Sequence, residues 1–340
     1  MKILYLGANS GNSKLRELAM RRLGHEVMAI DPYKALPSAL VKWGFKSGYL
    51  GISHAVRQYV NARIQNSTFD LVWVDQGDAC NADLIGDLRR HRVPIVNYCQ
   101  DNPYVKRDGY RWRQLLRAIP EYNLIVTPRE SNVATAYEAG ARAVMRVMFA
   151  ADEVVHRAQQ IEQNEVAEYT SQVSFVGTWM PERGSFLISL LKRGVAITIF
   201  GPRWEKAPEF PALKPYLRLG PLSSQRYVKA IQCSSIAIGL LSKGNEDLHT
   251  TRSIEIPAIG TLFCAERTSE HMDMYNDGEE AVFWKDAAEC ADVCLNLLND
   301  PQRLTAIAKA GHERALKNGN FNENLISSVL KRLSSVGVEF

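Results

Sequence analysis

The most informative charged residues of the chain lie in its second half, next to glycines that end predicted strands. The segment SFVGTWMPERG ends one such strand at Gly177, continues through Thr178, and places Arg183 at the start of a predicted helix. A guanidinium there can hold a phosphate through two parallel hydrogen bonds, and the free N–H groups of the helix start add positive potential. The pattern therefore indicates a site for a phosphate group.

A second group of reactive side chains follows in the segment NEDLHTTRSIEIPAIG, which contains Asp247, His249, Arg252 and Glu255. Arg252 and Glu255 fall on a predicted short helix, and Asp247 precedes that helix. Since a carboxylate can accept hydrogen bonds from neighbouring hydroxyl groups, two acids at this spacing predict a site for a ribose or a hexose. His249 is a candidate for contact with the phosphate or the sugar. The alternative for each of these residues is a solvated or salt-bridged surface side chain.

Two more glycine-containing loops end predicted strands in this half. The segment ITIFGPRW ends a strand at Gly201, and RLGPLSS places Gly220, Pro221 and Leu222 before another helix. Ligands of open α/β sheets bind at the carboxyl ends of the strands. We therefore expect these loops to line the same site.

The segment GANSGNS near the start of the chain follows the first predicted strand and includes Asn9, Ser10 and Gly11. Small residues at a helix start let backbone N–H groups approach an anion. The spacing from Gly11 to Asp31 is also about that between the glycines and the ribose-binding acid of a dinucleotide-binding domain, although the full glycine pattern is broken at Asn9. A ligand-binding loop and a tight strand-to-helix turn both remain open.

The segment QDNP follows another predicted strand of the first half and contains Asp101 and Asn102. Asp101 is a candidate general base, or a group that orients a substrate hydroxyl. The alternative is a turn stabilised by an Asp-Asn-Pro sequence.

Short apolar runs alternate with amphipathic stretches along both halves of the chain, which indicates parallel sheets covered by helices on both faces. In the first half we predict strands at 3–6, 26–30, 71–74, 95–98, 124–126 and 143–148, with helices at 14–23, 52–64, 82–90 and 130–139. In the second half we predict strands at 173–176, 196–200, 236–240, 261–264 and 281–284, and final helices at 302–316 and 323–333.

A polar stretch rich in Gln and Glu divides the two series of elements. We predict a first Rossmann-like domain at 1–151, a linker at 152–172, and a second Rossmann-like domain at 173–318. Two doubly wound α/β domains of this kind are expected to face each other across a cleft. We expect the C-terminal helix, within 319–340, to pack back on the first domain.

Composition and charge exclude several classes of protein. The 340 residues are 46% hydrophobic and 23% charged with a net charge of +4, which is ordinary for a folded protein and too weakly basic to argue for nucleic-acid binding. No apolar run approaches the roughly 18 residues of a membrane span, and we expect a cytoplasmic protein without a signal peptide. The six cysteines lack zinc-site spacing, so we predict reduced buried thiols and no metal site.

The second half of the sequence resembles the C-terminal domain of the GT-B glycosyltransferases, and within them the branch of CgeB-like spore-maturation proteins. The resemblance covers most of the range 124–316. It rests on the segments VSFVGTWMPERG and MFAADEVVH, on NYCQDNP more weakly, and on a pattern carried here by Arg252, Glu255, Ala258, Gly260, Asp277, Gly278, Glu279, Asp300, Pro301, Arg303 and Leu304.

This resemblance implies an enzyme of the hexosyltransferase kind that moves a sugar from a nucleoside-diphosphate sugar, most simply a UDP-sugar, to an acceptor, without a metal and with retention of configuration. It implies that Glu255 binds the ribose and that residues 220–222 frame the base. It also implies that Arg183 binds the diphosphate, with either Arg252 or Lys243 as a further cation. The sugar acid of the related enzymes corresponds to Asp247, with Glu246 beside it, and the resemblance leaves open which of the two contacts the sugar. Asn9, Ser10, Gly11 and Asn102 are expected on the acceptor side.

Several alternatives stay open on the sequence alone. The GANSGNS loop with Asp31 allows an NAD(P)-dependent oxidoreductase, and the departure at Asp247 allows a nucleotide- or sugar-binding protein without turnover. The acceptor can be a carbohydrate, a lipid or a protein, and contact with a membrane surface stays open.

Overall fold

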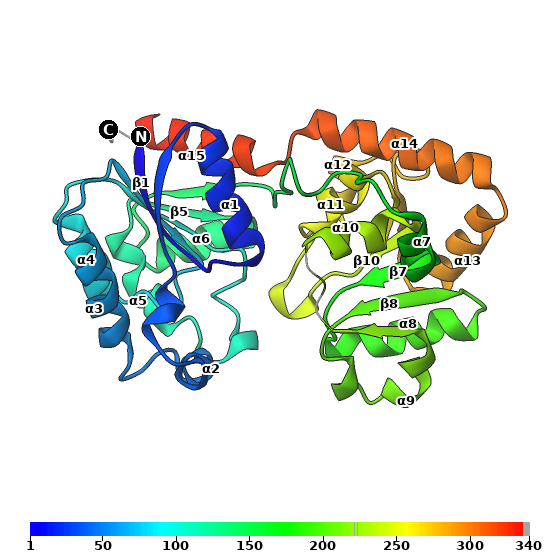
Figure 1. Cartoon of the computed structure of the whole chain (residues 1–340), viewed down its shortest axis with the longest axis horizontal. Coiled ribbons are helices and arrows are strands. Elements are labelled where there is room, and N and C mark those ends of the chain that lie inside the picture. Colours follow the sequence, from blue (N-terminus) through cyan, green and yellow to red (C-terminus); the bar gives the residue numbers. More distant parts are fainter. Residues whose placement is uncertain (221, 223, 336–340) are drawn as a thin grey trace. The chain divides into compact units, whose positions relative to one another are not determined.

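The computed structural model describes residues 1–220, 222 and 224–335 of the chain, which divides into two compact units. The first unit comprises Met1–Asp152 together with the C-terminal segment from Phe321, and the second comprises Glu153–Asn320. Each unit is a parallel sheet with helices on both faces (Figure 1). None of the helices in the described part of the chain is long and apolar enough to cross a membrane.

The sheet of the first unit has the strand order β2-β1-β3-β4-β5-β6, and all its pairings are parallel. Its strands form from short runs of apolar residues; β3, for example, has the sequence LVWVD and is buried throughout. A strand buried along its whole length requires cover on both faces, as parallel sheets have. The strands are β1 (Lys2–Leu6), β2 (Glu26–Ile30), β3 (Leu71–Asp75), β4 (Ile95–Tyr98), β5 (Leu124–Thr127) and β6 (Val144–Arg146).

Two hydrophobic cores flank this sheet. One lies beneath α3, α4 and α5, and the other beneath α1 and the C-terminal helix α15, which lie side by side (Figure 1). The last helix of the chain therefore covers part of the first sheet. The helices of the unit are α1 (Gly11–Arg22), α2 (Ser38–Ser47), α3 (Ser53–Ile64), α4 (Ala82–Arg89), α5 (Arg113–Ala118), α6 (Ser131–Glu138) and α15 (Asn322–Ser335).

The sheet of the second unit has the strand order β12-β11-β10-β7-β8-β9, again with parallel pairings throughout. Five of its strands lie where the apolar runs predict them. The strand β9, with the sequence LRL, was not predicted because it is short and contains a charged residue. The strands are β7 (Ser171–Val176), β8 (Ile197–Gly201), β9 (Leu217–Leu219), β10 (Ser234–Gly239), β11 (Leu262–Glu266) and β12 (Val282–Trp284).

Residues 153–172, most of the expected linker, belong to the second unit, where Gln163–Tyr169 form helix α7 and Ser171 begins β7. The ion pair between Lys229 and Glu165, at 2.6 Å, holds α7 against α10. The remaining helices of the unit are α8 (Pro181–Lys192), α9 (Phe210–Leu213), α10 (Ser224–Gln232), α11 (Arg252–Ile259), α12 (Ser269–Met274), α13 (Ala287–Leu298) and α14 (Pro301–Asn318).

The strand order reverses direction once in each sheet. In the first unit β1 lies between β2 and β3, and in the second β7 lies between β8 and β10. The predicted class, two doubly wound α/β units, is confirmed. Such a reversal leaves a crevice at the carboxyl ends of the two central strands, and this crevice is where doubly wound sheets bind ligands.

Candidate functional site

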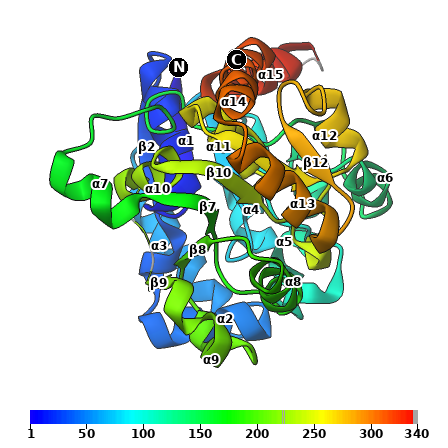
Figure 2. The same ribbon diagram turned by 90° about the vertical axis from the view of Figure 1, so that its right-hand side faces the viewer.

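The reversal point of the second sheet brings together the two loops that carry the predicted site. Strands β7 and β10 are neighbours, as Figure 2 shows, with Phe175 paired to Ile238. The loop after β7 begins at Gly177, and the loop after β10 runs from Leu240 to Thr251, where α11 begins. Because the strands are parallel, both loops leave the sheet at the same edge.

The buried side chain of Arg183 links these two loops by hydrogen bonds to their backbone carbonyls. Its side chain, on the first turn of α8, leaves only 6% of the residue exposed. The guanidinium donates from Nη1 to the carbonyl oxygen of Thr178 at 2.9 Å, and from Nη2 to those of Leu240 and Leu241 at 3.1 and 3.4 Å. These contacts fix the spacing of the loops. The predicted bond from Arg183 to a diphosphate stays a prediction.

Arg252 is the second guanidinium at this edge. Its Nε donates to the carbonyl oxygen of Val176, the last residue of β7, at 2.7 Å, and its guanidinium carbon lies 5.9 Å from the centre of the Tyr227 ring. The side chain is half-buried, and within the described part of the chain no carboxylate lies at ion-pair distance from it. Arg252 can therefore offer its positive charge to an anionic ligand.

Glu255 lies one helical turn beyond, on the first turn of α11, and is only 4% exposed. Tyr227 on α10 donates a hydrogen bond of 2.5 Å from its hydroxyl to Oε2, and Nε2 of His156 lies 3.6 Å from Oε1. Burial and the adjacent carboxylate raise the pKa of Tyr227 well above its usual value, so the hydroxyl keeps its proton and donates. A carboxylate can accept about four hydrogen bonds, so this one retains acceptor capacity for a ligand.

Sequence reasoning assigned no role to Tyr227 or His156. Tyr227 stands 28 residues before its partner Glu255, and His156 lies in the polar segment before α7. In the sequence, His156 was noted only as part of the segment MFAADEVVH. Its contact with Glu255 depends on how the unit packs, so the sequence could not predict that contact.

The two predicted sugar-binding acids, Asp247 and Glu246, lie in the loop between β10 and α11 and differ in burial. Asp247 is buried, and its backbone N–H donates to the carbonyl oxygen of Ser242 at 3.3 Å. Glu246 is exposed and has a left-handed backbone conformation with φ of 58°. His249 is also buried, and its Nδ1 is hydrogen-bonded to Glu270 at the start of α12. The predicted role of His249 at a phosphate or sugar therefore has a structural competitor in Glu270.

The loops after β7 and β8 lie in direct contact. Gly201 has φ of 135° and lies against the backbone of Gly177, so a side chain there would displace the neighbouring loop. The Thr178 hydroxyl donates to the carbonyl oxygen of Pro202 at 3.2 Å. Beyond β9, Gly220 has φ of 98° and Leu222 is half-buried, whereas Pro221 lies outside the described residues.

The glycine loop of the first unit borders a pocket of about 310 Å³ at the ends of β1 and β2. Its lining includes Asn9, Lys14, Asp31, Lys34 and Arg63. Ser10 occupies the N-cap position of α1, and Gly11 opens that helix with φ of 56°.

The carboxylate of Asp31 is already engaged by the backbone. It accepts hydrogen bonds from the N–H groups of Asn9 at 3.1 Å and Tyr33 at 3.0 Å. These bonds fix the glycine loop and the turn after β2. Since a carboxylate can accept about four hydrogen bonds, Asp31 keeps acceptor capacity, and its ribose-binding role in an oxidoreductase stays an open alternative.

The QDNP segment forms a turn after β4. Asn102 is buried, and its side-chain oxygen accepts a hydrogen bond from the N–H of Tyr104 at 3.1 Å, as in an Asx turn. Asp101 is an ion-pair partner of Arg111 at 3.4 Å, and Arg111 also contacts Asp78 at 2.9 Å. These contacts hold the Asp101 carboxylate beside the guanidinium of Arg111, and its predicted role as a base or as a group that orients a hydroxyl stays a prediction.

Residues 183–326 match the family model described as glycosyl transferase-like. Among solved structures, the chain is similar to sucrose-phosphate synthase from Thermosynechococcus elongatus, with a TM-score of 0.70, 11% identity, and coverage of 99% of this chain and 100% of the other. It is also similar to HepE from Anabaena in complex with UDP-glucose, with a TM-score of 0.68, 13% identity, and coverage of 98% and 100%. The chain has the GT-B fold.

The GT-B fold is also present in a protein from Listeria monocytogenes assigned as a UDP-N-acetylglucosamine 2-epimerase, with a TM-score of 0.63, 11% identity, and coverage of 98% and 96%. At such identities the likeness establishes the fold, and the reaction must be argued from the site. A comparison with curated protein sequences finds no match. The matched range 183–326 begins at Arg183 and includes Tyr227, Arg252 and Glu255, so it contains most of the site described above.

Proposed function

We propose that the protein is a glycosyltransferase that uses a nucleoside-diphosphate sugar, with UDP as the favoured nucleotide. The proposal rests on two side chains of one helix, α11, at the reversal point of the second sheet. Glu255 is a buried carboxylate, and Arg252 is a guanidinium that has no carboxylate of the described residues at ion-pair distance. The glycosyl transferase-like match over the same residues supports it, as do structural neighbours solved with UDP and UDP-glucose. The motif pattern quoted above supports the narrower assignment to the CgeB-like branch.

In this proposal Glu255 accepts hydrogen bonds from the ribose hydroxyls, while Tyr227 and His156 hold its carboxylate in place. Arg252 contacts the diphosphate. Arg183 acts mainly by setting the distance between the two loops, because its guanidinium is engaged by their backbone carbonyls. Asp247 or Glu246 contacts the donor sugar, and His249 lies close enough in sequence to assist.

Transfer requires that negative charge developing on the leaving diphosphate be stabilised. A fixed cation in a partly buried site does this without reorganising at the moment of reaction. We assign the task to Arg252, in place of a metal ion, with a contribution from Lys243 in the loop between β10 and α11, where Lys243 is now an ion-pair partner of Glu266. Retention of configuration at the sugar carbon is part of the proposal.

The acceptor belongs, in this proposal, to the first unit. Asn9, Ser10 and Gly11 border or adjoin its pocket of about 310 Å³, which has the size of a site for a sugar-like ligand. Asp101 and Asn102 lie at the end of another strand of the same sheet, where Asp101 would orient an acceptor hydroxyl. We also propose a cytoplasmic location, supported by the six free cysteines.

The first test is a binding screen by thermal shift with UDP, GDP, ADP and TDP beside NAD and NADP. We expect UDP to raise the melting temperature and the dinucleotides to leave it unchanged. Stabilisation by NAD or NADP alone would instead support the oxidoreductase alternative, whose site is the GANSGNS loop of the first unit.

A second measurement separates transfer from the other activities that this fold supports. Incubation with UDP-sugars and a panel of carbohydrate acceptors should release UDP and form a larger glycoside. Conversion of one UDP-sugar into its epimer without UDP release would indicate an epimerase. Binding of UDP with no product of either kind would leave a nucleotide-binding protein without turnover.

A further inference from the structure

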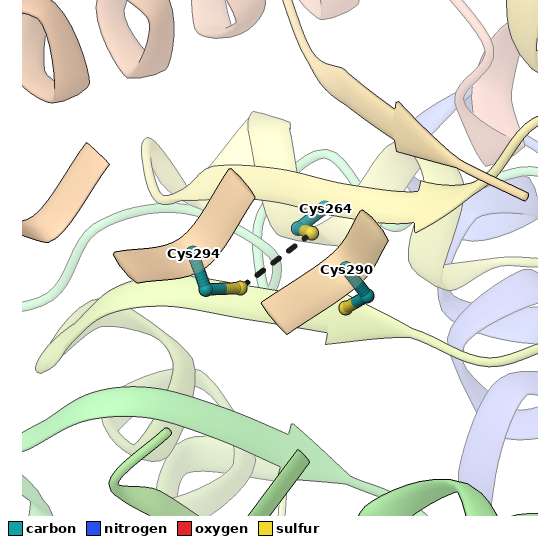
Figure 3. A group of neighbouring side chains, drawn as sticks. All are labelled: Cys264, Cys290 and Cys294. Atoms are coloured by element: carbon teal, nitrogen blue, oxygen red, sulfur yellow. Dashed lines mark hydrogen bonds between the residues drawn. The ribbon is translucent and has the colours of Figure 1, made fainter. Parts of the chain in front are cut away.

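Away from the candidate site, the second unit gathers three cysteines in its core. Cys264 lies on β11, and Cys290 and Cys294 lie on α13; Figure 3 shows the three side chains directed toward one another. Their sulfur atoms all lie within 4.8 Å of one another, and those of Cys264 and Cys294 are 4.0 Å apart. Each of the three residues is fully buried.

Helical spacing and core packing explain why the three cysteines lie together. Cys290 and Cys294 are four residues apart on a helix, so they lie on the same face of α13. That face packs into the core against β11 and β12, where Cys264 faces it among Val282 and Leu297. The sulfur of Cys264 on β11 thus meets those of Cys290 and Cys294 on α13 where two buried surfaces join.

The spacing of the sulfurs matches that of ligands around one metal ion. A metal–sulfur bond is about 2.3 Å long, and three such bonds in a trigonal plane place the sulfurs roughly 4.0 Å apart. The Cys264–Cys294 distance of 4.0 Å has this value already. Cys290 needs only a small rotation to join them, because its sulfur lies within the 4.8 Å limit.

The number and chemistry of the three sulfur donors indicate which metal ion fits the cluster. Structural zinc takes four ligands, and among the described residues this cluster has three members, with no histidine or carboxylate completing it. Sulfur donors favour soft ions, of which Cu(I) is the first-row example. We propose that Cys264, Cys290 and Cys294 form a three-sulfur binding site for a soft monovalent cation, represented by Cu(I).

The charge of the ion also suits an apolar interior, where an uncompensated charge is costly. One thiolate and one monovalent cation form a neutral pair, and the other two sulfurs add lone pairs. Binding then releases one thiol proton to solvent and changes the oxidation state of neither metal nor sulfur.

The test is a titration of the full, reduced chain with Cu(I) under anaerobic conditions, in competition with a chromogenic Cu(I) chelator. We expect one Cu(I) per chain to be withdrawn from the chelator, and Zn(II) to be held more weakly. Cys264→Ser, Cys290→Ser and Cys294→Ser should each weaken Cu(I) binding by about 100-fold or more, beyond the loss typical of outer-shell partners. A wild-type chain that withdraws no Cu(I) would refute the site and leave three thiols serving only as small core residues.

The matched control keeps the cluster and removes the other thiols, through Cys80→Ser, Cys99→Ser and Cys233→Ser combined. This variant should retain the wild-type affinity for Cu(I), and its loss would overturn the assignment. Because Cu(I) binding to the folded state must stabilise it, the wild-type melting temperature should also rise with Cu(I), whereas a folded Cys290→Ser variant should show no rise. None of these measurements depends on glycosyl transfer.

Discussion

The replacement Glu255→Gln tests the nucleotide site most directly. Gln has nearly the size of Glu and keeps one oxygen that can accept the 2.5 Å hydrogen bond of Tyr227, so the packing of α10 against α11 should survive. What is lost is the charge and one acceptor oxygen. If that oxygen binds a ribose hydroxyl, the loss of a hydrogen bond to a charged group costs about 1.5–3 kcal/mol. The Kd for UDP should therefore rise roughly 10- to 150-fold.

The assay is isothermal titration of UDP into wild type and variant, with urea unfolding to confirm that both are folded. Glu313→Gln is the matched control, because Glu313 is an exposed acid of α14 in the same unit; its Kd for UDP should equal that of wild type. A folded Glu255→Gln variant with an unchanged Kd would show that this carboxylate, despite its burial and its bond to Tyr227, does not hold the nucleotide.

Four further predictions concern charge and stability. Arg252→Ala should weaken UDP binding about 10-fold or more and leave uridine binding unchanged, since only UDP carries the diphosphate; equal losses for both ligands would contradict the assignment. Arg183→Ala should lower the free energy of unfolding by about 2–4 kcal/mol in urea, because it leaves buried carbonyls of two loops without their donor. Burial lowers the pKa of His271 from 6.5 to about 4, so the native state holds this ring neutral. The contribution of the neutral ring to the free energy of unfolding is complete above pH 6.5 and is lost as the pH falls toward 4. The free energy of unfolding measured in urea should therefore change less with pH across this range in His271→Asn than in wild type. Asp75→Asn should destabilise the protein by about 3–5 kcal/mol, because it leaves the buried guanidinium of Arg16, now bonded to Asp75 at 2.6 and 3.0 Å, without its counter-charge; a thermal melt close to that of wild type would refute this.

The strands and the fold class could be predicted from the sequence because their signal is local. A short apolar run rich in β-branched residues, such as LVWVD, is typical of a buried parallel strand, and eleven of the twelve strands among the described residues were predicted from runs of this kind. The short β9 does not, because LRL owes its pairing to its neighbour β8 rather than to its own composition.

The candidate site could be predicted only as a set of residues, not as an arrangement. Arg252 and Glu255 were found because they share one helical turn. The environment of Glu255 could not be found, since Tyr227 and His156 reach it from other elements. For Arg183 the sequence predicted a phosphate contact, which stays a prediction; its hydrogen bonds to loop carbonyls could not be predicted, because only the folded sheet brings those carbonyls near.

Because α15 belongs to the first unit, the two units are completed at different times during synthesis. All six strands of the first sheet are synthesised before Glu153, yet the part of the sheet that α15 covers stays exposed until residues 322–335 emerge. The second unit, which is continuous in the chain, can be complete by then. The first unit is therefore begun before the second and completed after it, and truncation of the chain before residue 322 would remove part of the hydrophobic core of the first unit.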